Sequence, residues 1–129
     1  MYMKGNVLYV EDEEFFAKTI SNKLQEDDIA VDIASDGEQG IAKLAEKEYD
    51  AILLDLMLPK VSGFDLLKKI PSLSKNKTTP IVILSNLSSD ADKEKANDLG
   101  AHSFYVKINS TPNEILSVVQ AIIDTRKNA

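Results

Sequence analysis

The sequence contains no cysteine, and this absence removes several kinds of chemistry at once. Without cysteine the chain can form no disulfide, no thiolate metal site and no thiol nucleophile, and it suits a reducing compartment. Tryptophan is also missing, and His102 is the only histidine, so the chain lacks the imidazole pairs typical of zinc sites. A metal site in this protein has to be built from oxygen ligands.

Long hydrophobic runs and an excess of positive charge are missing as well. No apolar run approaches the roughly 20 residues of a membrane-spanning helix, and the N-terminal apolar segment is far too short for a signal peptide. The formal net charge is −6 and the lysines are scattered, whereas a nucleic-acid binder needs a basic stripe. We therefore expect a cytoplasmic protein that binds neither membranes nor nucleic acid, with metal ions or cationic partners as its natural ligands.

What the chain does contain is a regular alternation of two patterns. No linker, low-complexity tract or sequence repeat interrupts its 129 residues, so we expect a single domain over 1–129. Short apolar, often β-branched runs, which predict strands, occupy residues 6–10, 30–34, 51–54, 80–84 and 103–106. Segments with apolar residues at helical spacing follow each run, at 16–24, 41–45, 64–70, 89–99 and 115–122.

Five β-α units in succession predict a doubly wound α/β fold of the flavodoxin-like kind, (βα)5, with parallel strands in the order 2-1-3-4-5. Helix signals agree with it: residues 111–114, Thr-Pro-Asn-Glu, form a capping box, 89–92 form a looser version, and Gly100 stops the fourth helix. That helix has few apolar residues, and we expect it to be loosely held.

Polar side chains follow four of the five predicted strands. These are Glu11 and Asp12 after the first, Asp55 after the third, Ser85 after the fourth and Lys107 after the fifth. In an open α/β sheet the carboxyl ends of the strands form one rim, where ligands bind. The loop after the second strand carries only an ordinary turn, as expected for an edge strand.

The predicted strand order makes the first and third strands neighbours, so Glu11, Asp12 and Asp55 should crowd together. Carboxylates at such range repel one another unless a cation neutralises them, and oxygen ligands with retained waters favour Mg²⁺ or Mn²⁺. A metal, a hydroxyl and a lysine around one carboxylate are also the parts needed for phosphoryl transfer. Asp55 would then be the nucleophile.

Each of these residues taken singly also fits a structural role. Asp12 could cap the first helix, Ser85 could be a polar strand end, and Lys107 could be a solvated surface residue. Asp55 fits such a role least, because it interrupts the apolar run LLDLMLP and an ionised buried acid is costly. Their convergence on one rim favours the functional interpretation.

Four dispersed motifs, in order, carry a family resemblance over essentially the whole chain. They are VLYVEDEE at 7–14, LLDLMLPKVSGFDLL at 53–67, PIVILSN at 80–86 and LGAHSFYVK at 99–107. With them the chain resembles the receiver domain of two-component response regulators, and in particular stand-alone receivers of the chemotaxis type.

The resemblance implies a phosphorylation-dependent signalling switch. Asp55 would accept a phosphoryl group from a histidine kinase or a phosphotransfer protein, while Asp12, Asp55 and the main-chain carbonyl of Met57 hold Mg²⁺, with Glu11 assisting directly or through water. Ser85 and Lys107 would contact the phosphoryl oxygens.

Tyr105 matches the family's aromatic switch residue, although it also fits an ordinary strand position. Its movement would remodel the face made of the fourth helix, fifth strand and fifth helix, where a downstream protein binds. A phosphorylation-linked dimer is a further option. The protein would catalyse its own phosphoryl uptake and hydrolysis without being a multiple-turnover enzyme.

The chain departs from the family pattern at four positions. Ile108 stands where most receivers have a proline in a cis peptide bond, so we expect either a trans bond with a rearranged Lys107 or a strained cis bond. Met57 and Leu87 cannot orient an attacking water and are bulky enough to shield the phosphoryl group, which predicts slow self-dephosphorylation. Glu11 replaces the commoner Asp, and its longer side chain favours indirect metal contact.

Three other functions remain as alternatives. A flavin carrier shares the strand order, but the acidic EDEE stretch would repel its phosphate and the chain has no tryptophan. A phosphohydrolase with an Asp nucleophile would need a second acid at position 57, which is Met57. A receiver-like interaction module that is never phosphorylated is the third, and the departure at Ile108 favours it slightly.

Overall fold

The computed structural model describes residues 3–128 and contains the predicted five-stranded parallel sheet, in the order β2-β1-β3-β4-β5. The strands are β1 (Gly5–Val10), β2 (Ile29–Ala34), β3 (Ala51–Leu54), β4 (Ile81–Ser85) and β5 (Ser103–Val106). The α-helices are α1 (Glu14–Glu26), α2 (Gly37–Glu46), α3 (Gly63–Lys69), α4 (Asp90–Asp98) and α5 (Pro112–Lys127). Short 3₁₀ helices are η1 (Ile70–Ser72), η2 (Ser74–Asn76) and η3 (Lys107–Asn109).

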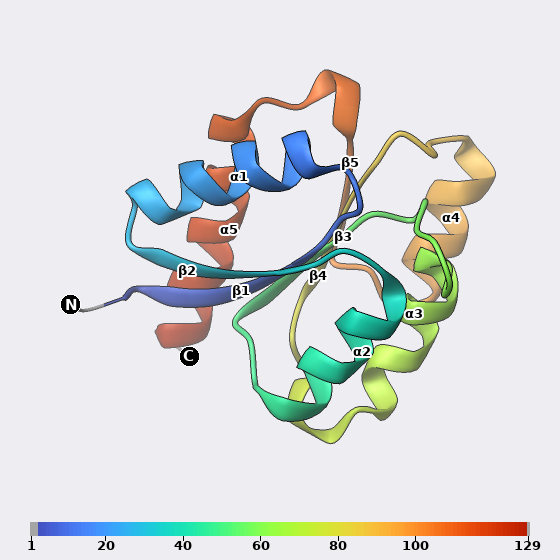
Figure 1. Cartoon of the computed structure of the whole chain (residues 1–129), viewed down its shortest axis with the longest axis horizontal. Coiled ribbons are helices and arrows are strands. Elements are labelled where there is room, and N and C mark those ends of the chain that lie inside the picture. The colour runs from blue at the N-terminus through green and yellow to red at the C-terminus, as the bar shows by residue number, and fades with distance from the viewer. Residues whose placement is uncertain (1–2, 129) are drawn as a thin grey trace.

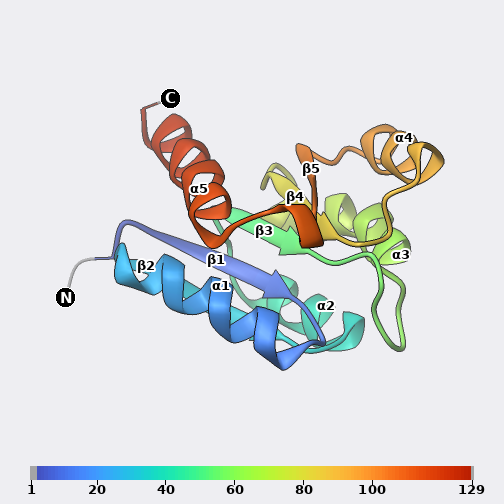
Figure 2. The ribbon, with the colours of Figure 1, turned by 90° about the horizontal axis from the view of Figure 1, so that it is seen from above.

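The helices cover both faces of the sheet, as right-handed crossovers between parallel strands require. Figure 1 shows α1 and α5 on one face and α2, α3 and α4 on the other, and Figure 2 shows the same three layers from above. No helix within residues 3–128 combines the length and the apolar character needed to span a membrane.

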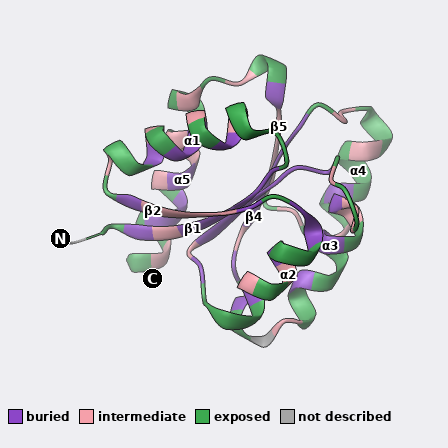
Figure 3. Cartoon of the chain, viewed as in Figure 1, coloured by how far each residue is buried: buried purple, intermediate pink, exposed green. Residues whose placement is uncertain are grey.

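The core is divided by the sheet into two apolar clusters, because successive strand residues point to opposite faces. Val7, Tyr9 and Leu53 belong to the cluster under α1 and α5, while Leu8 and Leu54 belong to the cluster under the other helices. Figure 3 shows burial concentrated on the central strands β1, β3 and β4, whereas the edge strands β2 and β5 are mostly of intermediate burial. This alternation also decides to which side the residues just beyond each strand point.

Helix termini follow the predicted capping signals, with one reversal. The full reciprocal capping box forms at Ser89 and Asp92, where we expected the looser version. At the start of α5, Thr111 accepts a hydrogen bond from the N–H of Glu114, which is one half of a capping box. The fourth helix is weakly held, as predicted, since Ala96 is the only buried one of its 9 residues.

The strand register places the predicted site residues at one rim. Val10 of β1 lies beside Leu54 of β3, and the N–H of Asp55 donates to the carbonyl of Val10 (3.1 Å), so the pairing continues one residue past the strands. Ser85 pairs with Val106 at the ends of β4 and β5. The residues that follow β1, β3, β4 and β5 therefore emerge at the same rim of the sheet.

Candidate functional site

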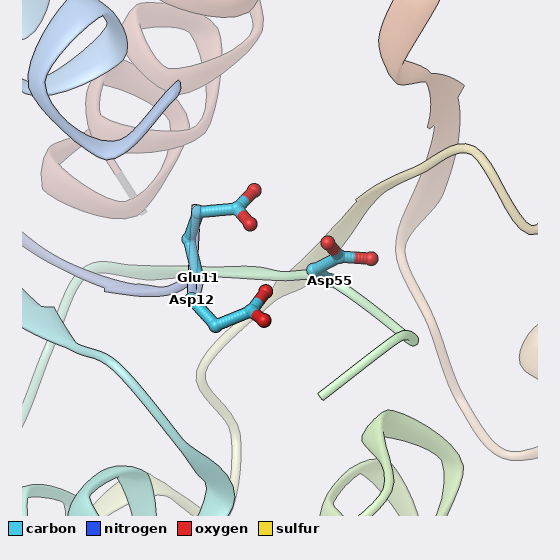
Figure 4. Close-up of side chains that lie close together, drawn as sticks. All are labelled: Glu11, Asp12 and Asp55. Atoms are coloured by element: carbon cyan, nitrogen blue, oxygen red, sulfur yellow. The ribbon is translucent and has the colours of Figure 1, made fainter. Parts of the chain in front are cut away.

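The three acidic residues predicted to crowd together do so. One carboxylate oxygen each of Glu11, Asp12 and Asp55 lies within 4.8 Å of the other two. Figure 4 shows Glu11 and Asp12 directing their carboxylates to opposite sides at the end of β1, beside Asp55 from the neighbouring strand. Glu11 and Asp55 are buried, whereas Asp12 is exposed. Three oxygen ligands with an open, wet side fit an ion that keeps part of its water shell, as Mg²⁺ does.

Lys107 points into this cluster and compensates its charge. Its Nζ lies 2.8 Å from Glu11 Oε1 and 2.9 Å from Asp55 Oδ2, and it stands 4.6 Å from the centre of the Phe16 ring. The lysine side chain is only 2% exposed. Burial alone lowers the pKa of Lys107, but the hydrogen bonds to Glu11 and Asp55 outweigh it and raise the pKa above its usual value. The ammonium thus stays charged and bridges two carboxylates.

The peptide bond before Ile108 follows the trans alternative and not the cis one. No peptide bond within residues 3–128 is cis, and Lys107 Nζ reaches Asp55 with this trans bond in place. After Lys107 the chain turns directly into η3. Ile108 has an N–H that proline would lack, and this N–H donates to Asn86 Oδ1 at 2.9 Å.

Glu11 and Asp55 are held by further hydrogen bonds from their own loops. Asp55 Oδ1 accepts from the N–H of Met57 (3.0 Å), and Glu11 Oε2 accepts from the N–H of Glu13 (3.1 Å). Burial raises the pKa of Glu11, and the hydrogen bond from Lys107 opposes that rise. The Glu11 carboxylate therefore depends on Lys107 to stay ionised in its buried position.

Tyr9 is a site residue that the sequence reasoning missed. It is fully buried in β1, and its hydroxyl donates to Glu11 Oε1 at 3.0 Å. The signal was present in the sequence, because residues i and i+2 of a strand share a face and a buried tyrosine hydroxyl needs a partner. A tyrosine two positions before a buried acid meets both conditions.

Ser85 ends β4, Leu87 lies two residues beyond it, and Met57 lies in the loop after β3. The Ser85 side chain is buried and its Oγ accepts from the N–H of Leu87 (3.2 Å). Leu87 is half-buried and packs against the apolar cluster under α2, α3 and α4. Met57 is 57% exposed at the mouth of the site. Met57 and Leu87 are the two residues predicted to shield the phosphoryl group. Met57 is the more exposed of them, and the Leu87 side chain packs partly against the core.

Tyr105 lies away from the acidic cluster, on β5. It is half-buried and lines a groove of about 570 Å³ together with Pro80, His102 and the α5 residues Val118 and Ile122. The groove therefore opens on the surface formed by β5 and α5.

Gly63 lets the loop after β3 return to the backbone of Asp55 and Leu56. A Cβ on Gly63 would lie 2.3 Å from Leu56 Cα and 2.4 Å from the carbonyl oxygen of Asp55. Its N–H donates to the carbonyl of Leu56 (3.0 Å). Only glycine allows α3 to begin this close to the backbone of Asp55.

One class of protein combines this fold with an acidic cluster and a buried lysine, and comparison with known families identifies that class. Residues 7–120 match the family model of the response regulator receiver domain, and the chain belongs to this family. It is thus a receiver domain of the kind found in two-component systems.

Particular relatives agree in sequence and in structure. The response regulator ArlR of Staphylococcus saprophyticus is 38% identical over 117 residues, which cover 91% of this chain and 51% of ArlR. The chain thus spans about half the length of the curated relatives it matches. Chemotaxis protein CheY4 of Vibrio cholerae is similar with a TM-score of 0.85 and 30% identity, covering 94% of this chain and 99% of CheY4.

A third relative was solved with a metal. The receiver domain of the sensor histidine kinase PA1611 from Pseudomonas aeruginosa has a magnesium ion coordinated in its active-site cleft. It is similar to this chain with a TM-score of 0.84 and 25% identity, covering 93% of this chain and 98% of that domain.

Proposed function

We propose that this chain is a cytoplasmic, phosphorylation-dependent signalling switch whose phosphoryl acceptor is Asp55. The observation that carries the proposal is the surroundings of Asp55, which is buried beside two further carboxylates and 2.9 Å from the buried ammonium of Lys107. A structural carboxylate does not need two acidic neighbours and a buried lysine. An acceptor that has to bind a metal and a dianionic phosphoryl group does.

Magnesium is the metal we propose for the acidic cluster, with manganese as a substitute. Glu11, Asp12 and Asp55 supply carboxylate oxygens, and the main-chain carbonyl of Met57 is a further candidate ligand. Support comes from the oxygen-only donor set, from the exposed side of Asp12 and from the magnesium ion of the related PA1611 receiver. The bound ion would neutralise charge on the phosphoryl oxygens.

The proposed reaction is one phosphoryl transfer. A carboxylate oxygen of Asp55 attacks the phosphorus of a phosphohistidine, the new O–P bond forms as the N–P bond breaks, and the electron pair returns to the donor imidazole. Lys107 would exchange its contacts with the two carboxylates for a phosphoryl oxygen, and Ser85 would donate to another. The donor is a histidine kinase or a phosphotransfer protein. The large apolar side chains of Phe15 and Ile108 are each 76% exposed and offer the donor a docking surface near Lys107.

The output of the switch is a protein contact. Movement of Ser85 towards the phosphoryl group would pull on the β4–α4 loop, and Tyr105 would turn on β5, reshaping the face of α4, β5 and α5. Weak attachment of α4 through Ala96 supports this proposal, since little packing opposes its movement. A downstream protein or a second copy of the chain would bind there. A single receiver domain over residues 1–129 is also part of the proposal.

Incubation with Mg²⁺ and a small acyl-phosphate donor, followed by intact-mass measurement, tests the central step. Wild type should gain the mass of one phosphoryl group, and the matched variant Asp55→Asn should not. Equal labelling of both proteins would refute the assignment of Asp55. No labelling of wild type would favour the interaction module that is never phosphorylated, and continuous turnover of the donor at enzyme-like rates would favour a phosphohydrolase.

A further inference from the structure

Tyr9 occupies the centre of β1, between β2 and β3, where its register partners are Ile33 and Leu53. The side chain is fully buried in the apolar cluster under α1 and α5. Glu11 follows two positions later on the same face of the sheet, and the Tyr9 hydroxyl donates to Glu11 Oε1 at 3.0 Å. An apolar residue of similar size would fill this space, so the hydroxyl is the feature that needs a reason.

The Glu11 carboxylate is fixed by three donors of different kinds. Oε1 accepts from the Tyr9 hydroxyl and from Lys107 Nζ (2.8 Å), and Oε2 accepts from the N–H of Glu13 (3.1 Å). Under the proposed function, Lys107 leaves Glu11 when a phosphoryl group arrives. Tyr9 and the backbone of Glu13 are then the contacts that keep the carboxylate in place.

We propose that Tyr9 is a positioning residue of the metal site, holding the Glu11 carboxylate at the edge of the acidic cluster so that it can bind Mg²⁺ directly or through water. The proposal rests on the proposed magnesium site. Partners that orient a metal-binding side chain are worth about 10–100-fold in metal affinity, because a free side chain has to be ordered on binding. Loss of the Tyr9 hydroxyl should therefore weaken Mg²⁺ binding without removing a metal ligand.

The chain contains a matched control for this experiment. Tyr49 is also buried, and its hydroxyl donates to a carboxylate oxygen, Asp32 Oδ2, at 2.8 Å. Asp32 lies within β2 and pairs with Lys47, outside the acidic cluster. Tyr9→Phe and Tyr49→Phe thus delete the same atom from the same kind of hydrogen bond, and only the first is next to the metal site.

The experiment measures Mg²⁺ affinity by calorimetric titration of the unphosphorylated protein, with no phosphoryl donor present. Tyr9→Phe should bind Mg²⁺ at least tenfold more weakly than wild type, and Tyr49→Phe should bind within twofold of wild type. A variant with Phe at the three other tyrosine positions keeps Tyr9 as its only phenol. Its ultraviolet difference spectrum should show a tyrosine band on Mg²⁺ addition, because the charge acting on the Tyr9 hydroxyl changes.

The outcomes separate the two proposals. Absence of Mg²⁺ binding by wild type would overturn the metal site, and with it this role of Tyr9. Binding by wild type together with unchanged affinity of Tyr9→Phe, or equal weakening in both tyrosine variants, would overturn the role of Tyr9 alone. If Tyr9→Phe does not fold, the difference band of the single-tyrosine variant decides, and a flat spectrum at saturating Mg²⁺ refutes the proposal.

Discussion

Replacing Lys107 by methionine removes the one buried cation that faces Glu11 and Asp55 within the described site. Methionine has nearly the length of the lysine side chain, so the change deletes the charge and leaves the packing near Phe16 largely intact. The lysine, Glu11 and Asp55 side chains are 2%, 0% and 4% exposed. Water therefore cannot take the place of the lost ammonium without opening the site.

The size of the effect follows from this burial. Removing one partner of a buried ion pair costs about 3–5 kcal/mol, since the other charge stays buried without compensation. At about 3 kcal/mol the unfolding equilibrium constant rises by roughly a hundredfold, and with an m-value of about 2 kcal/mol/M the urea midpoint falls by about 1.5 M. Lys47→Met is the control, because Lys47 is 49% exposed in its pair with Asp32, and such pairs contribute about 0–1 kcal/mol.

Urea unfolding at pH 7, with chelator and then with excess Mg²⁺, measures the effect. Mg²⁺ should raise the midpoint of Lys107→Met more than that of wild type, because the ion replaces the missing positive charge. The pH dependence has a definite sign: the pKa of Lys107 is raised, so its contribution is complete below about pH 10.5 and is lost as the pH rises through the folded-state pKa. The difference in urea midpoint between wild type and Lys107→Met should therefore shrink at alkaline pH.

Equal urea midpoints of wild type and Lys107→Met in chelator would refute this reasoning. Such a result would mean that the carboxylates of Glu11 and Asp55 are protonated or hydrated in the folded protein, and that the Lys107 ammonium is not needed to compensate their charge. A large fall in the urea midpoint of Lys47→Met would also refute it, because stability would then depend on the loss of any positive charge and not on the burial of Lys107.

Three further variants test other parts of the site. Met57→Asn should shorten the phosphoryl half-life several-fold, followed by intact mass after donor removal, because an amide can orient the attacking water that an exposed thioether cannot. Gly63→Ala should lower stability by about 1–3 kcal/mol or more in urea unfolding, since its Cβ would meet Leu56 Cα at 2.3 Å; wild-type stability would show that the loop relaxes freely. Asn86→Ala should slow labelling by the acyl-phosphate donor several-fold, but should have no effect in an Ile108→Pro background, where the N–H that Asn86 accepts from is absent. An equal effect in both backgrounds would exclude this hydrogen bond as the cause.

Much of the fold was determined by local sequence patterns. Five β-branched runs separated by helical spacing admit only parallel strands joined by crossovers, and the strand order puts Glu11, Asp12 and Asp55 at one rim. Even the weak packing of α4 followed from its few apolar residues. These features depend on which residues are apolar and on the two periodicities of strand and helix, which a sequence displays directly.

The contacts within the site were decided by tertiary structure. The sequence left open a trans bond with a rearranged Lys107 or a strained cis bond, and only the structure shows that the bond is trans and that the N–H of Ile108 donates to Asn86, 22 residues away. It marked Tyr9 as a strand residue and gave no sign of which carboxylate oxygen its hydroxyl meets. Sequence fixes which residues share a face, but hydrogen bonds depend on ångström-scale distances, and these are set by how strands and loops pack together.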